Sequence, residues 1–116
     1  GVLEYAFAIE VDGEHYVFPV DARDYSYKYP EFDNVRAVFT HLWLGRDAAL
    51  KLDELYVDDF CRFARSFGTE RIYTAHLLET RRDITNMWSD IHLAIIRERI
   101  PCIEAPRIGE LIRLGE

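Results

Sequence analysis

The chain has 116 residues, of which 49% are hydrophobic and 30% are charged, and its formal net charge is −7. These values predict one globular domain over residues 1–116, long enough to bury a core without disulfide or metal staples. The acidic balance excludes a protein that neutralises a long DNA backbone, so we expect no binding to double-stranded DNA. Acidic proteins bind other proteins, cations or small ligands more readily.

The two cysteines and the hydropathy pattern indicate the compartment. Cys61 and Cys102 are isolated in apolar contexts and form no CxxC pair, which predicts buried free thiols. The sequence shows no signal peptide, and no apolar run reaches the roughly 18 residues that a membrane span requires. We therefore expect a cytoplasmic protein without membrane attachment.

The first twenty residues predict a β-hairpin around Asp12-Gly13, a pair typical of the type I′ two-residue turn. Such a turn sets the register, so Phe7 faces Phe18 on one side and Glu10 faces His15 on the other. We expect the apolar side to pack on the core; its first-strand members are Tyr5, Phe7, Ile9 and Val11. The Glu10–His15 pair is either an exposed cross-strand pair or a carboxylate that orients an imidazole for acid/base work.

An aromatic segment follows the hairpin between Asp21 and Asp33. Its rings belong to Tyr25, Tyr27, Tyr29 and Phe32. An extended chain places the three tyrosines on one side, and Pro30 with its acidic neighbours indicates an exposed edge. Two interpretations stay open: the rings pack in the core or at the sheet edge, or they form a binding face. Base stacking normally needs a basic groove, so the acidic surroundings favour a protein partner.

Two further elements follow from the periodicity. Val35–Leu44 is β-branched and aromatic up to Gly45, which predicts a central third strand, antiparallel to the hairpin. A period of 3.6 residues then predicts a helix over Asp47–Phe67, ended by Gly68 at its C′ position. The apolar stripe of this helix consists of Leu52, Tyr56, Phe60, Phe63 and Phe67.

The C-terminal half continues with alternating strands and helices. Arg71–Leu78 predicts a strand, and Asp83–Arg99 predicts a helix that Ile100-Pro101 ends. Cys102-Ile103 predicts a short strand. Ile108–Ile112 predicts a last short helix, because its apolar residues follow a proline.

This order predicts the α/β (α+β) class, with a mixed five-stranded sheet and helices against its faces. In connectivity alone it resembles the ribonuclease H-like superfold. That resemblance implies two Mg²⁺ ions held by acidic residues on the first strand, the first helix, the end of the fourth strand and the last helix. The matching positions are Asp12 or Glu10, Glu54 or Asp53, Glu79 or Asp83, and Glu110. Because 21 residues are acidic, acids near such places are also expected by chance.

No motif points to a particular reaction. The histidines lack zinc-ligand spacing, and Arg81-Arg82 lacks the glycine-rich loop of a phosphate site. GxSxG, P-loop and catalytic Cys/His signatures are also missing from the sequence. The sequence therefore predicts a small binding or regulatory module that acts through a protein partner, with no catalysis or cofactor of its own. A Mg²⁺-dependent nuclease of ribonuclease H-like topology is the alternative, and self-association into a homo-oligomer stays open.

Overall fold

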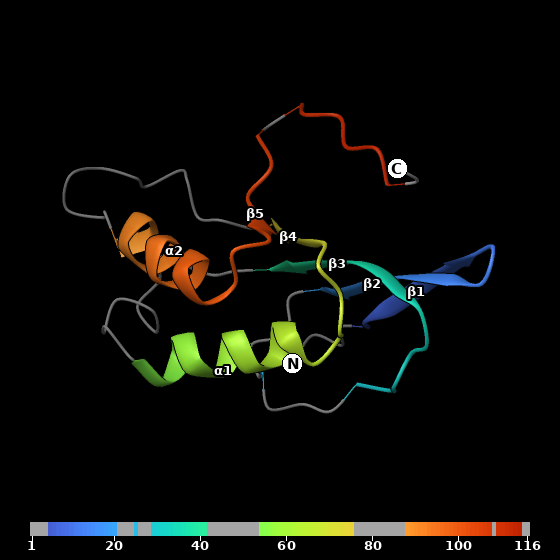
Figure 1. Cartoon of the computed structure of the whole chain (residues 1–116), viewed down its shortest axis with the longest axis horizontal. Helices are drawn as coiled ribbons and strands as arrows, with labels where there is room; N and C mark the ends of the chain where they lie inside the picture. The colour runs from blue at the N-terminus through green and yellow to red at the C-terminus, as the bar shows by residue number, and fades with distance from the viewer. Residues whose placement is uncertain are drawn as a thin grey trace.

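The computed structural model describes residues 5–20, 25, 29–41, 54–75, 88–107 and 109–114. Within these ranges the chain forms a mixed five-stranded sheet and two helices, which confirms the α/β class (Figure 1). The elements are β1 (Phe7–Val11), β2 (Glu14–Val20), β3 (Val35–His41), α1 (Glu54–Arg65), β4 (Ile72–Ala75), α2 (Trp88–Arg99) and β5 (Ile103–Glu104). The strands lie in sequence order across the sheet; β1 and β2 are antiparallel, and the remaining neighbours are parallel.

The predicted hairpin is confirmed in its turn and in its register. Asp12 and Gly13 have φ angles of 51° and 79°, the positive values that a type I′ turn demands at both central positions. The turn pairs Phe7 with Phe18, and the remaining residue pairs of the two strands have the predicted register. Local backbone chemistry therefore determines this part of the fold.

The third strand runs parallel to β2, so the prediction of an antiparallel third strand is wrong. Parallel neighbours need a crossover connection, and residues 21–34 provide it. Tyr25 in this connection packs its ring against Phe60 and Phe63 of α1, with ring centroids 5.3 Å apart in both pairs. The ribonuclease H-like resemblance assumed three antiparallel strands and is not confirmed.

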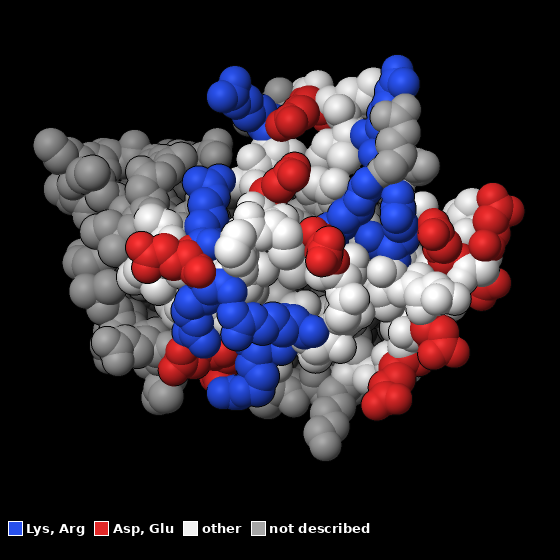
Figure 2. Space-filling model, in the orientation of Figure 1, with Lys and Arg blue, Asp and Glu red and all other residues white. Residues whose placement is uncertain are grey.

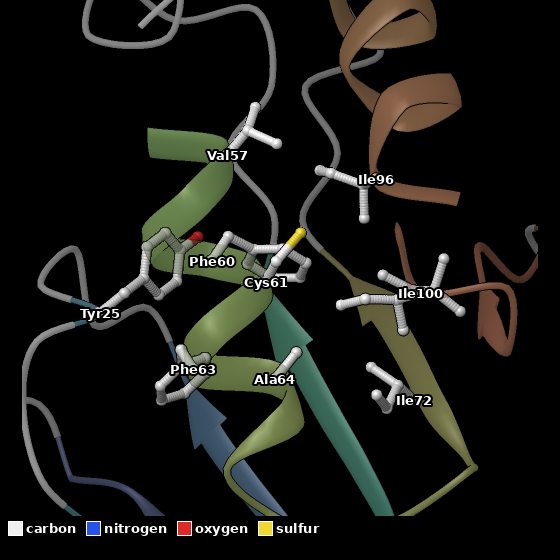
Figure 3. Packing of buried hydrophobic residues seen from close by; sticks show 10 residues of the cluster. Tyr25, Val57, Phe60, Cys61, Phe63, Ala64, Ile72, Ile96 and Ile100 are labelled. Carbon is white, nitrogen blue, oxygen red and sulfur yellow. The ribbon is translucent and has the colours of Figure 1, made fainter. Parts of the chain in front are cut away.

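Both helices pack against the same face of the sheet. Ile72 of β4 and Ile103 of β5 share one buried cluster with Phe60 of α1 and Ile96 of α2 (Figure 3). Because β3, β4 and β5 follow one another in one direction, crossovers of the same hand carry both helices to one side. Within the described residues, the helices therefore cover one face of the sheet. The sequence predicts helices against its faces, and only one face has them in this part of the chain.

This arrangement reverses the expected orientation of the hairpin. Val17 of β2 pairs with Val38 of β3, which in turn pairs with Ile72 of β4. Because Ile72 faces the helices, Val17 lies on the helix side as well, and it is 1% exposed. Phe7 and Ile9 lie on the other face and are 52% and 47% exposed. The prediction that Phe7 packs on the core face is wrong, because the helices that build the core lie on the opposite side.

Apart from the predicted last helix, the predicted helices and strands are present where they are described. Gly68, with a φ of 66°, donates its N–H to the Arg65 carbonyl at 3.1 Å and ends α1. Helix α2 ends at Arg99, before Ile100-Pro101, as the sequence predicts. Strand β5 begins one residue later than expected. The first parts of both predicted helices, residues 47–53 and 83–87, lie outside the described residues.

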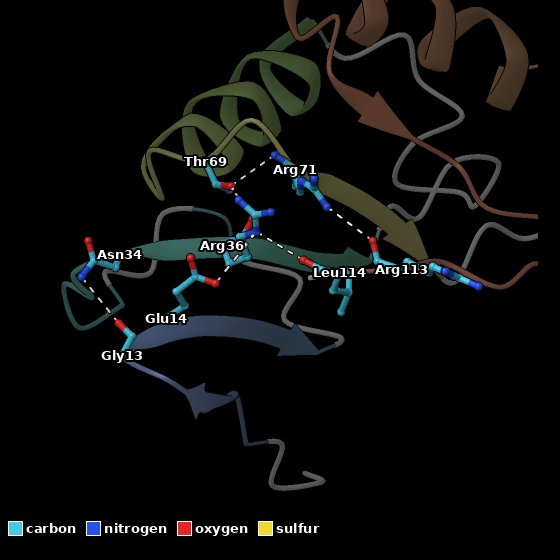
Figure 4. Close-up of polar contacts among 8 residues, drawn as sticks. All are labelled: Gly13, Glu14, Asn34, Arg36, Thr69, Arg71, Arg113 and Leu114. Atoms are coloured by element: carbon cyan, nitrogen blue, oxygen red, sulfur yellow. Dashed lines mark hydrogen bonds and ion pairs between the residues drawn. The ribbon is translucent and has the colours of Figure 1, made fainter. Parts of the chain in front are cut away.

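The predicted last helix is wrong: residues 105–107 and 109–114 contain no helix. Gly109 has a φ of 79°, and the Glu110 carboxylate accepts the Arg107 N–H at 2.7 Å in a local turn. So short a window gains too little to offset helix nucleation. Two arginines hold this segment to the sheet: Arg36 Nε donates to the Leu114 carbonyl at 3.2 Å, and Arg71 Nη1 to the Arg113 carbonyl at 3.5 Å (Figure 4).

Candidate functional site

A groove of about 660 Å³ lies between the segment before β3 and the C-terminal half of α1. We call it the aromatic groove. Tyr29, Pro30 and Phe32 form one wall, and Phe63 and Phe67 form the other. Tyr25, Val35, Arg62, Ser66 and two acidic residues, Glu31 and Asp33, complete its lining. The groove therefore combines exposed ring surface with charged groups at its margins.

The walls of the aromatic groove are held together by ring contacts. Tyr29 meets the edge of Phe63 with centroids 5.5 Å apart and lies 5.9 Å from Phe67, while Phe63 and Phe67 are perpendicular at 5.2 Å. The Tyr29 hydroxyl also donates to the Pro19 carbonyl at 3.3 Å. Edge-to-face pairs of this kind are worth about 0.5–1.5 kcal/mol beyond their buried area, so the wall is preformed.

The far end of the groove is tied to the hairpin. His15 Nδ1 lies 2.6 Å from the Asp33 carbonyl oxygen, and its Nε2 lies 3.3 Å from the Glu10 carboxylate. The Phe32 ring packs on the imidazole at 5.3 Å. In addition, the His15 backbone N–H donates to the Asn34 carbonyl at 2.9 Å. The predicted Glu10–His15 pair is thus confirmed as a contact, and it helps to position the groove wall.

The four predicted binding residues have different places. Tyr25 is 8% exposed and donates its hydroxyl to the His41 carbonyl at 3.4 Å, so it belongs to the core and touches the groove only at its floor. Tyr29 and Phe32 are half-buried and line the groove. Tyr27 lies outside the described residues. The core interpretation therefore applies to Tyr25, and a binding face that includes Tyr29 and Phe32 stays a prediction.

Sequence reasoning missed the opposite wall, which comes from α1 and the turn after it. The sequence pattern places Phe63 and Phe67 in the apolar stripe of the predicted helix. Phe63 is buried, but Phe67, at the end of the stripe, is half-buried and faces the groove. The position of Phe67 beyond the last helical turn, directly before Gly68, is the one signal that separates it from the core.

A second hollow of about 590 Å³ lies over the adjacent ends of α1 and α2. It is lined by Asp58, Arg62, Arg65, Ser66 and Arg99, and we call it the arginine hollow. Arg99 Nη1 pairs with Asp58, and this hydrogen bond raises the pKa of Arg99 above its ordinary value. Arg65 Nη2 donates to the Arg99 carbonyl. Both helices end here, so the guanidinium groups also offset the negative ends of two helix dipoles.

The two cysteines differ in environment. Cys61 is buried in the core between the helices, as predicted, whereas Cys102 is only half-buried. Burial raises the pKa of the Cys61 thiol, and the neighbouring Arg99 and Arg65 lower it less. The burial of Cys61 among apolar side chains makes it a packing residue.

The acidic positions of the nuclease alternative do not come together where they are described. Asp12 lies at the hairpin turn, Glu54 begins α1, and Glu110 caps a turn in the C-terminal segment. Glu79 and Asp83 lie outside the described residues. Among the described side chains, no group of three or more His, Cys, Asp or Glu residues is arranged to hold a metal ion such as Mg²⁺.

No family model, curated protein or solved structure matches this chain. Neither helix in the described ranges has the length and apolar character needed to cross a membrane. The aromatic groove and the arginine hollow are therefore the features of this chain that bear on its function.

Proposed function

We propose that this protein is a small acidic binding module whose aromatic groove receives an extended segment of a partner protein. The observation that carries the proposal is the groove itself, in which the half-buried rings of Tyr29, Phe32 and Phe67 line one concave surface. Aromatic side chains give large contact areas at a low cost in conformational entropy, because only two torsions are immobilised. Aromatic side chains, Phe and Tyr included, are enriched in protein interfaces relative to the rest of the surface.

The preformed walls support this role. Tyr29 is fixed by Phe63, Phe67 and the Pro19 carbonyl, and Phe32 is fixed against the His15 imidazole. A site whose side chains are already ordered loses less free energy on association. The volume of the groove, about 660 Å³, also lies in the range of sites that enclose several apolar side chains or a small ligand.

The test is selection of binders from a random-peptide display library on the immobilised chain, followed by titration of the selected peptides in solution. We expect Phe32→Ala and Phe67→Ala to lower the affinity for these peptides by about tenfold or more, because each substitution removes one ring from a wall of the groove. Phe7→Ala is the control, because it removes the same kind of ring, one that is more exposed, from the opposite face of the sheet. Thermal unfolding of each variant checks that the fold is retained.

Two results contradict the proposal. In the first, the selected peptides bind the Phe32→Ala and Phe67→Ala variants as tightly as the unchanged chain. In the second, Phe7→Ala is the variant that abolishes binding, which would mean that the binding site lies on the other face of the sheet.

A further inference from the structure

The aromatic groove and the arginine hollow are neighbours. Both are lined by Arg62 and Ser66, on the last turn of α1 and directly after it. A peptide that occupies the groove and continues past Ser66 therefore passes next to three guanidinium groups. Figure 2 shows basic side chains gathered over the adjacent ends of α1 and α2.

The charge of the arginine hollow contrasts with that of the whole chain. Arg62, Arg65 and Arg99 face two nearby carboxylates, Asp58 and Asp59, in a chain of net charge −7. Arg62 pairs with Asp59 at 3.0 Å, yet its side chain is 73% exposed. Each guanidinium carries five N–H donors, and the contacts given above use one nitrogen of each. Further donors on these side chains are therefore able to bind an added carboxylate.

The two walls of the aromatic groove carry opposite charges. Glu31 and Asp33 are exposed on the wall before β3, whereas Arg62 lies on the α1 wall and also lines the arginine hollow. Aromatic rings line both walls. Charges of opposite sign at two places in one site fix how a partner segment is placed, and they disfavour a segment whose charges are exchanged.

We propose that the aromatic groove recognises a segment of a partner protein in which an acidic and a basic residue flank an apolar anchor. The acidic side chain pairs with Arg62 and Arg65 in the arginine hollow, the apolar anchor contacts Tyr29, Phe32 and Phe67, and the basic side chain lies near Glu31. This inference rests on the proposed function, and it adds the chemistry of the partner segment.

The test uses a tight-binding peptide from the display selection, prepared in three forms: unchanged, with its acidic residues changed to the amides, and with the acidic and basic positions exchanged. We expect the amide and exchanged forms to bind about tenfold more weakly or worse. The chain variants are Arg62→Glu and the milder Arg62→Gln. Arg97→Glu is the matched control, because Arg97 is an exposed arginine in the last turn of α2 and does not line the hollow.

We expect Arg62→Glu to lower the affinity for the unchanged peptide by about tenfold or more. The Arg62→Glu variant should bind this peptide and its amide form with similar affinity. Arg97→Glu should leave the affinity within about twofold, because this arginine lies outside the hollow. If Phe32→Ala weakens binding but no variant or peptide shows dependence on charge, the further inference is overturned and the proposed function stands. If Phe32→Ala has no effect, the proposed function itself fails.

Discussion

The aromatic residues of this chain form two clusters with different packing. On the helix side of the sheet, Tyr25, Phe60 and Phe63 meet at tilted or perpendicular angles and are at most 8% exposed. On the other face, four rings from four strands form a parallel stack that we call the ring row: Phe7, Phe18, Phe39 and Tyr73. Neighbouring centroids in the ring row are 4.7–5.2 Å apart.

Exposure along the ring row changes with position in the sheet. Tyr73 on β4 is 7% exposed, the two middle rings are half-buried, and Phe7 on the edge strand is 52% exposed. The clusters consist of the same residue types, so residue type does not determine burial. The crossovers place α1, α2 and Tyr25 on one face, and within the described residues that face alone has helices to bury its rings. The comparison therefore predicts unequal costs for equal substitutions.

The largest effect is expected at the centre of the helix-side cluster. Phe60 is fully buried, and Phe60→Ala should lower the free energy of unfolding by about 3–5 kcal/mol, because it removes the ring and leaves a cavity. Urea unfolding followed by circular dichroism measures the loss. A value under about 1 kcal/mol would show that this cluster is not the core of the molecule.

A smaller effect is expected at the exposed end of the ring row. Phe7→Ala removes a half-exposed ring that stacks on Phe18 at 4.8 Å, so the free energy of unfolding should fall by about 1–2 kcal/mol. The same urea experiment provides the comparison with Phe60→Ala. Equal losses in the free energy of unfolding for the two variants would mean that the ring row is as well buried as the helix-side cluster. The proposed difference between the two faces would then be wrong.

A pH-dependent effect is expected at Cys61, on the helix side of the sheet. Burial places the pKa of folded Cys61 above that of the unfolded chain, which is about 8.5. Its contribution to stability is therefore complete below that value and is lost as the pH rises through the folded pKa. Urea unfolding at pH 7 and at about pH 10 measures how much the free energy of unfolding falls between these two values. We expect a smaller fall for Cys61→Ala than for the unchanged chain. Cys102→Ala serves as the control, and identical losses in all three proteins would contradict the assignment.

The smallest effect is expected at the contact between Glu10 and His15, next to the wall of the aromatic groove. The Glu10 side chain is 67% exposed, so its coupling to His15 should amount to about 0.2–1 kcal/mol. A double-mutant cycle of Glu10→Gln and His15→Asn isolates this term from the His15–Asp33 hydrogen bond. When the imidazole is protonated, the coupling should decline in about 1 M salt, because exposed charges are screened. A larger coupling that resists salt would show that the pair is buried.

The sequence by itself determined the elements whose cause is local. The Asp12-Gly13 turn requires positive φ at both positions, and that requirement sets every rung of the hairpin. Gly68 ends α1 for a similar reason, and the residues before Pro101 end α2. At the groove, the density of rings around Pro30 marked Tyr29 and Phe32 as candidate binding residues. Each of these signals lies within a few residues of the structure that it predicts.

Only the tertiary structure decided which surfaces meet. A hairpin has two faces, and the choice between Phe7 and Val17 as the buried side depends on crossovers that come later in the chain. The same crossovers made β3 parallel to β2, buried Tyr25 and brought Phe67 opposite Tyr29. Turn geometry is set by the energies of single residues, whereas burial is set by packing between segments far apart in sequence. The groove has one wall from each of two such segments, so no single stretch of sequence contains it.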